Sequence, residues 1–96
     1  MILQKDIEKE LKELKPTLSA KYYVDKIGYF GSFARNEQTE NSDIDIVVSF
    51  KKPVGVEFID LADYLEAMFH RKIDLVSLNG IKAKYFSEIE KEIIYV

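Results

Sequence analysis

The sequence predicts a small α/β or α+β fold, in which helices pack on one face of a mixed β-sheet and leave the other face open for a site. Two patterns favour this fold. Apolar side chains recur at helical spacing in three stretches, and between these stretches lie short runs that are typical of strands. The chain has 96 residues, of which 47% are hydrophobic. We therefore expect one core and a single domain over residues 1–96.

The first third of the chain should contain a helix, a strand and a tight turn. The first twenty residues carry an apolar stripe among lysines and glutamates, which indicates an amphipathic helix that we expect to be disturbed around Pro16. Residues 26–30 are typical of a short strand, which leads directly into Gly31, Ser32 and one helical turn. The polar residues 36–42 indicate a loop. The stripe consists of Leu3, Ile7, Leu11, Leu14 and Leu18.

A second strand should cover residues 43–50, where apolar residues stand at every even position. This period of two is typical of a strand with one face against a core. Asp43 and Asp45 occupy odd positions. Both carboxylates should therefore point the same way, away from the core.

The rest of the chain should add two helices and one strand. A turn over 51–55 precedes a helix that ends near Phe69, and a third strand follows over 73–77. A turn around 79–80 leads to a last helix that ends near the apolar tail 93–96. The two apolar stripes consist of Phe58, Leu61, Ala62, Leu65, Met68 and Phe69, and of Tyr85, Phe86, Ile89 and Ile93.

Composition excludes several classes of function. A net charge of −3 and a pI near 5.2 argue against nucleic acid as a main partner, but they allow a small anionic ligand held by a metal. Cysteine is absent, so the chain has neither disulfides nor a thiolate metal site, which fits a reducing, cytoplasmic setting. No apolar run approaches the roughly 20 residues of a membrane span, and the N-terminus is charged and unlike a signal peptide. We expect a soluble protein without a membrane partner.

The most informative motif is Gly31-Ser32, followed after ten residues by Asp43-Ile44-Asp45. These four positions would coincide by chance in about one chain of this length in a thousand. Residues two apart on a strand lie about 7 Å apart on one face, so the two carboxylates can converge on shared cations. Carboxylates suit Mg²⁺, which completes its coordination with phosphate oxygens and water. The alternative is an ordinary turn followed by solvated acids. Without metal, at least one clustered carboxylate should bind a proton more readily than a free Asp.

A third carboxylate, Asp74, lies between Ile73 and Leu75 in the third predicted strand. It should leave the buried face, as Asp43 and Asp45 do, and can lie beside them on an adjacent strand. We predict that it is a metal ligand or the base next to the attacking group. The alternative is a charge that protects an edge strand from aggregation.

The turn between the first strand and the loop has the residues of a phosphate-binding site. Gly31 lacks a β-carbon, so that a phosphate can approach the backbone closely. Ser32 offers a hydroxyl and an amide at the start of a helical turn. Arg35, one turn further on, can bind a phosphate oxygen or pair with an acid on the surface.

These segments resemble the minimal nucleotidyltransferase (MNT) family of the DNA polymerase β superfamily. The resemblance rests on Phe30-Gly31-Ser32-Phe33-Ala34-Arg35, on Ser42-Asp43-Ile44-Asp45, and on an Asp in a later strand, Asp74. It implies the palm-like nucleotidyltransferase fold, a triphosphate on Gly31 and Ser32, and two Mg²⁺ ions on the three aspartates. Many relatives have Gly where this chain has Asn36, and Asn tolerates the left-handed conformation that the turn would require.

The resemblance also implies a function. Proteins of this type often pair with a HEPN-domain toxin and transfer AMP from ATP to one of its tyrosines, thereby acting as antitoxins. The acceptor should come from another molecule. The alternative is a nucleotide-binding antitoxin that neutralises its partner by complex formation with little or no catalysis. Tyr85, Phe86, Ile94 and Tyr95 can pair two copies into a homo-oligomer or contact a partner, and burial in the core explains them equally well.

Overall fold

A computed structural model describes residues 2–96 as a four-stranded mixed sheet with the order β3-β2-β1-β4. Strands β2 and β3 are parallel, and the other neighbouring pairs are antiparallel. The predicted fold class is confirmed. The strands are β1 (Val24–Phe30), β2 (Ile44–Phe50), β3 (Ile73–Ser77) and β4 (Ile94–Tyr95), and the helices are α1 (Gln4–Tyr22), α2 (Gly31–Ala34), α3 (Val56–Phe69), α4 (Ala83–Ile89) and the 3₁₀ turn η1 (Glu90–Glu92).

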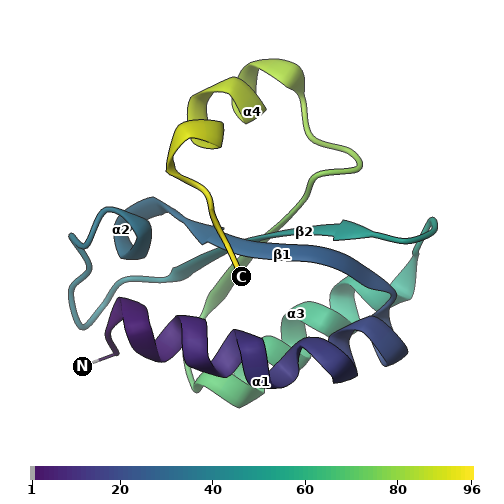
Figure 1. Ribbon diagram of the computed structural model, residues 1–96, viewed down its shortest axis with the longest axis horizontal. Coiled ribbons are helices and arrows are strands. Elements are labelled where there is room, and N and C mark those ends of the chain that lie inside the picture. The colour runs from purple at the N-terminus through teal and green to yellow at the C-terminus, as the bar shows by residue number, and fades with distance from the viewer. Residues whose placement is uncertain (1) are drawn as a thin grey trace.

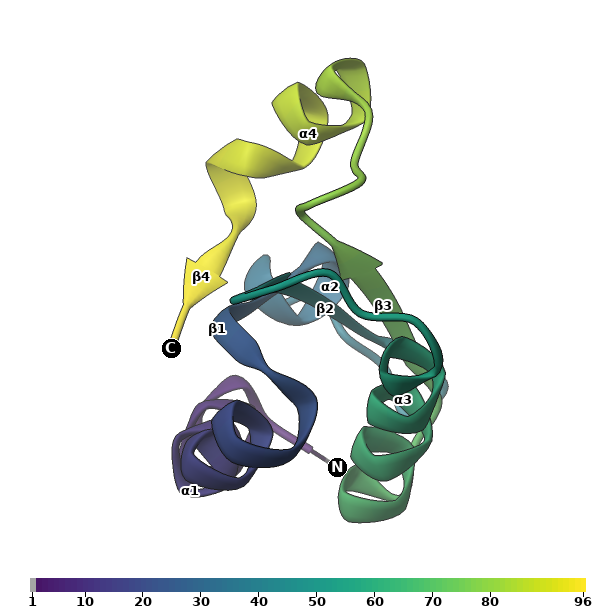
Figure 2. The ribbon, with the colours of Figure 1, turned by 90° about the vertical axis from the view of Figure 1, so that its right-hand side faces the viewer.

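The two long helices, α1 and α3, lie side by side on one face of the sheet (Figures 1 and 2). The alternation predicted for β2 is confirmed, because Ile44 and Ile46 are fully buried whereas Asp45 between them is partly exposed. Burial of this apolar layer is the main favourable contribution to folding. The core against the helices includes Ile7, Leu11, Leu14 and Leu18 from α1, Leu61, Leu65 and Phe69 from α3, and Ile27, Tyr29, Ile44, Ile46 and Val48 from the sheet.

Helix α1 runs without interruption through Pro16, so the predicted disturbance is wrong. Pro16 is exposed, whereas Leu14 and Leu18 on either side of it are buried against the sheet. Packing of the buried stripe therefore keeps the helix continuous across one missing amide. Leu3 lies outside the helix as its N-cap and is 42% exposed, so it does not belong to the stripe.

The second face of the sheet is only partly open. Figure 2 shows α4 above the sheet, opposite α1 and α3. Its residue Ile89 is buried in a small second cluster with Phe30 and Val47. After α4 the chain returns to the sheet as β4, a strand that the sequence did not predict, and pairs with Gly28 and Tyr29 of β1. No helix within residues 2–96 has both the length and the apolar character of a membrane span.

Candidate active site

Three strand ends meet where β1 ends and β2 and β3 begin. In the parallel pair, Asp45 of β2 lies directly opposite Asp74 of β3. In the antiparallel pair, Asp45 lies opposite Phe30, the last residue of β1. Asp43 immediately precedes β2. The sheet register thus brings together the carboxylates that the sequence predicts and the Gly31 turn.

Asp45 is the most buried of the three aspartates, since Asp43 and Asp74 are exposed. Burial raises the pKa of Asp45 from its usual 3.8 to about 6, and the negative charge of Asp74, a hydrogen bond with it and the charge of Asp43 add to the effect. Asp43 also lies 4.0 Å from the ammonium of Lys72. The expectation that one clustered carboxylate binds a proton readily agrees with this geometry.

The same carboxylates fit a divalent cation whose coordination is completed by a ligand. Within residues 2–96, no three acidic or histidine side chains already form a cage around one point. Hard cations such as Mg²⁺ are usually held by one or two carboxylates together with phosphate oxygens and water. The adjacent pair of Asp45 and Asp74 offers this arrangement.

Gly31 is required by two features of its surroundings. Its φ of +71° lies in the left-handed region that side chains disfavour. A β-carbon on Gly31 would also lie 2.0 Å from Oδ2 of Asp45. The glycine therefore lets the turn pass directly over the carboxylate, which places the start of α2 against the aspartates.

The remainder of the turn follows the sequence prediction. Ser32 is partly exposed at the second position of α2, and its carbonyl accepts a hydrogen bond from the amide of Glu37 at 2.8 Å. Asn36 has a φ of 58°, as predicted for a residue that replaces glycine in a left-handed conformation. Ser32 is thus held at the edge of the site by a compact loop.

Arg35 contacts two acids, which is the surface-pairing alternative considered for it. It donates through Nε to Glu37 at 2.7 Å and through NH1 to Oε2 of Glu92 at 3.0 Å. The other oxygen of Glu92 accepts a hydrogen bond from the Gly31 amide at 3.0 Å. Glu92 is separated from Gly31 by 61 positions and belongs to no motif, so its place in the site could not be predicted from the sequence.

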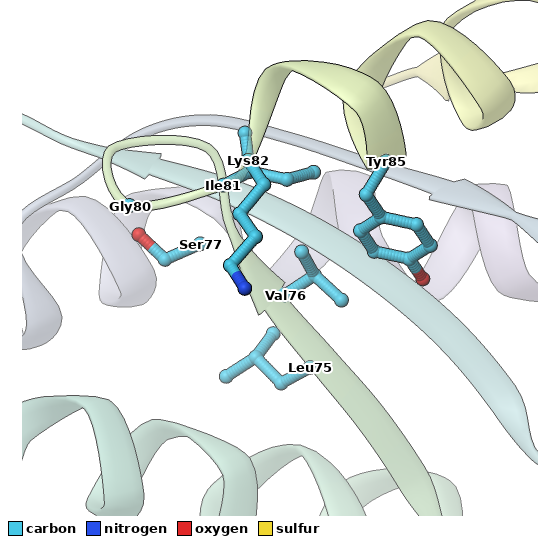
Figure 3. Close-up of a pocket in the computed structure, with 7 residues that line it drawn as sticks. All are labelled: Leu75, Val76, Ser77, Gly80, Ile81, Lys82 and Tyr85. Atoms are coloured by element: carbon cyan, nitrogen blue, oxygen red, sulfur yellow. The ribbon is translucent and has the colours of Figure 1, made fainter.

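An apolar groove of about 460 Å³ lies along β3, where its lining begins at Leu75, the residue after Asp74. In Figure 3 the Tyr85 ring and the Lys82 side chain reach down on either side of Val76. Burial, and then the charges of Asp74 and Asp45, raise the pKa of Tyr85, so its hydroxyl lies within the field of these carboxylates. Tyr95 lies in β4 at the opposite edge of the sheet, and therefore Tyr85 and Tyr95 do not form one patch.

Residues 6–96 match the family model described as a nucleotidyltransferase domain. The chain belongs to this family. It is similar to the protein adenylyltransferase MntA of Thermococcus cleftensis, with 37% identity over 97 residues that cover 100% of this chain and 98% of that protein. The chain is accordingly a nucleotidyltransferase, and enzymes of its family generally use divalent metals.

Two solved structures share the fold of this nucleotidyltransferase. One, provisionally described as a minimal nucleotidyltransferase, has a TM-score of 0.81 at 24% identity and covers 97% of this chain and 95% of its own. The other is a tri-AMPylated HEPN toxin of Shewanella oneidensis in complex with an MNT antitoxin. It has a TM-score of 0.62 at 22% identity and covers 96% of this chain and 66% of that chain.

Proposed function

We propose that this nucleotidyltransferase transfers AMP from ATP to a tyrosine of a HEPN-domain toxin and thereby acts as an antitoxin. The observation that carries the proposal is the register of Asp45 against Asp74, directly beneath the Gly31 turn. The activity named for the Thermococcus relative and the AMPylated toxin in the Shewanella complex support the choice of AMP and of the acceptor.

The triphosphate would lie against Gly31 and Ser32, at the start of α2. Asp43, Asp45 and Asp74 would hold Mg²⁺, with two ions as the expected number, because their oxygens are the hard ligands that this cation prefers. Bound there, the metal would neutralise phosphate charge during transfer. The metal would supply most of this positive charge, because the three aspartates are acidic and Arg35 is paired with Glu37 and Glu92.

In the proposed reaction the acceptor hydroxyl attacks the α-phosphorus of ATP in line. A bond forms between the acceptor oxygen and this phosphorus, the bond to the bridging oxygen of the β-phosphate breaks, and pyrophosphate leaves. Asp74 would accept the hydroxyl proton, because it is exposed on the edge strand β3 and next to the groove. The groove beside Val76 and Tyr85 has the apolar walls that would suit the ring of an acceptor tyrosine.

The test is transfer of label from ATP labelled in its α-phosphate, with Mg²⁺, to a HEPN-domain partner. Asp43→Asn should abolish the labelling. Asp63→Asn removes an equivalent exposed charge from α3 on the far side of the sheet and should leave labelling unchanged. Full labelling by the Asp43→Asn protein would refute the proposed roles. If no nucleotide labels the partner, yet the Asp43→Asn protein still neutralises it, the protein would instead act by complex formation.

A further inference from the structure

Glu92 lies where a phosphate of the nucleotide is expected. Its carboxylate oxygen Oε1 accepts a hydrogen bond from the Gly31 amide at 3.0 Å and one from Arg35 NH1 at 3.3 Å. The second oxygen, Oε2, lies 3.0 Å from the same guanidinium nitrogen. Both donors belong to the turn that the motif assigns to phosphate binding. A carboxylate and a phosphate oxygen are acceptors of the same kind for an amide and a guanidinium.

Glu92 brings a further negative charge to a turn that already lies against a carboxylate. Asp45 lies against the same Gly31 turn, since a β-carbon on Gly31 would meet its Oδ2. A further carboxylate at this turn adds negative charge to a site that already contains Asp45, Asp74 and Asp43. The arrangement is favoured by the two donors, and the same two donors would favour a triphosphate that arrives with its own cations.

We propose that Glu92 competes with the nucleotide triphosphate for the Gly31 amide and Arg35, so that ATP binds only when the Glu92 carboxylate leaves. The inference rests on the proposed function of the site. When Glu92 departs, Arg35 loses one of its two acidic partners and keeps only Glu37. The guanidinium nitrogen that contacted Glu92 is then available to a phosphate oxygen.

The local structure permits this exchange. Glu92 is the last residue of the three-residue turn η1, whose other two residues are exposed, and its own side chain is 27% exposed. Two residues further on, Ile94 begins β4, which pairs with β1 at Gly28 and Tyr29. A rotation of the Glu92 side chain can therefore empty the site while β4 stays in the sheet. Because ATP would bind only the open form, the measured affinity equals the affinity of the open form multiplied by the fraction of molecules that are open.

The test measures the dissociation constants of ATP and of inorganic tripolyphosphate by calorimetry, both in the presence of Mg²⁺. Glu92→Gln removes the competing charge, and Glu92→Asp keeps the charge but shortens its reach. Both variants should bind either ligand about three- to tenfold more tightly than the wild type, since the closed form loses a charge-assisted contact. Glu90→Gln makes the same charge change at an exposed position two residues earlier and should match the wild type.

The outcomes separate this inference from the function on which it rests. If the wild type binds Mg²⁺-ATP and the two Glu92 variants bind it equally well or more weakly, Glu92 does not compete and the inference is wrong, whereas the proposed function stands. If all four proteins are folded by circular dichroism and none binds ATP, the proposed function itself is wrong and the inference fails with it.

Discussion

At the scale of single residues, Gly31 has the least freedom to change. Gly31→Ala would place a β-carbon 2.0 Å from Oδ2 of Asp45 and would force an alanine to adopt a φ of +71°. The turn must then move away from the carboxylate. We expect AMP transfer to fall by about a hundredfold or more, as is usual when groups that position a substrate are displaced by about 1 Å.

The control for this change is Gly55→Ala. Gly55 has a φ of −116°, and a β-carbon there would meet nothing within 4 Å. Its transfer rate should match that of the wild type in the label-transfer assay, and thermal unfolding should show that the protein is folded. A Gly31→Ala enzyme with wild-type activity would show that the turn does not position the nucleotide.

Asp45 gives a prediction about pH. Its pKa of about 6 in the folded protein exceeds the usual 3.8, so the folded state binds more protons than the unfolded state between these values. The free energy of unfolding must therefore decrease as pH rises through this window. In metal-free protein, Asp45→Asn should raise the melting temperature at pH 7.5, and the gain should shrink toward pH 4.

Asp63→Asn serves again as the control, because Asp63 is exposed on α3. Measured at the same pH values, it gives the effect of removing one exposed carboxylate from the other face of the sheet. A gain for Asp45→Asn that is equal at pH 4 and pH 7.5 would mean that repulsion and burial at the carboxylates do not act on stability.

At the scale of elements, α1 contains a proline that its packing tolerates. Pro16 lies in the helix interior and is exposed. Pro16→Ala restores an amide that can donate to the carbonyl of Lys12, and should raise the free energy of unfolding by about 1–3 kcal/mol, the range set by the intrinsic cost of proline in a helix. Denaturant unfolding measures the change. Lys12→Ala, an exposed change one turn earlier, should alter stability by less than about 0.5 kcal/mol.

Helix α4 supplies one wall of the groove through Tyr85. Under the proposed function, Tyr85→Ala should raise the KM for the protein acceptor several-fold while the affinity for ATP stays unchanged, because the groove lies on the Asp74 side of the site. Tyr85→Phe keeps the ring and should resemble the wild type. Steady-state kinetics at varied acceptor concentration measures the KM of both variants. An equal effect of both variants on ATP binding alone would place the nucleotide, and not the acceptor, in the groove.

Local patterns predicted most of the elements because their physical causes are local. The alternation around Asp45 and the helical spacing around Leu11 and Leu65 depend on neighbours in sequence, and these elements are found where expected. The two-residue strand β4 and the position of Glu92 depend on pairing between distant segments. No periodicity can encode such a contact. The predicted disturbance of the helix at Pro16 was wrong for the same reason, since tertiary packing outweighs local propensity.

At the scale of the whole molecule, the sheet topology creates the candidate site. The motif spacing predicts which residues carry the chemistry, but not that Asp45 and Asp74 are register partners. That relation arises because β2 and β3 are parallel strands linked by α3, so that both begin at the same edge of the sheet. The long helices cover one face (Figure 2), whereas Asp43 and Asp74 are exposed and Asp45 is partly exposed.

This topology also predicts how metal and nucleotide depend on each other. Within residues 2–96 no three side chains form a finished metal cage, and the aspartates repel a triphosphate that arrives alone. Mg²⁺ or ATP separately should therefore change the melting temperature little, whereas the two together should raise it. At a ligand concentration of a hundred times the dissociation constant, the free energy of unfolding should increase by about 2.7 kcal/mol. Thermal unfolding with a non-hydrolysable ATP analogue measures the effect, and Asp43→Asn should lose most of it. If Mg²⁺ alone stabilises the protein as much as the pair does, the carboxylates already form a complete metal site, and the phosphates are not needed to complete it.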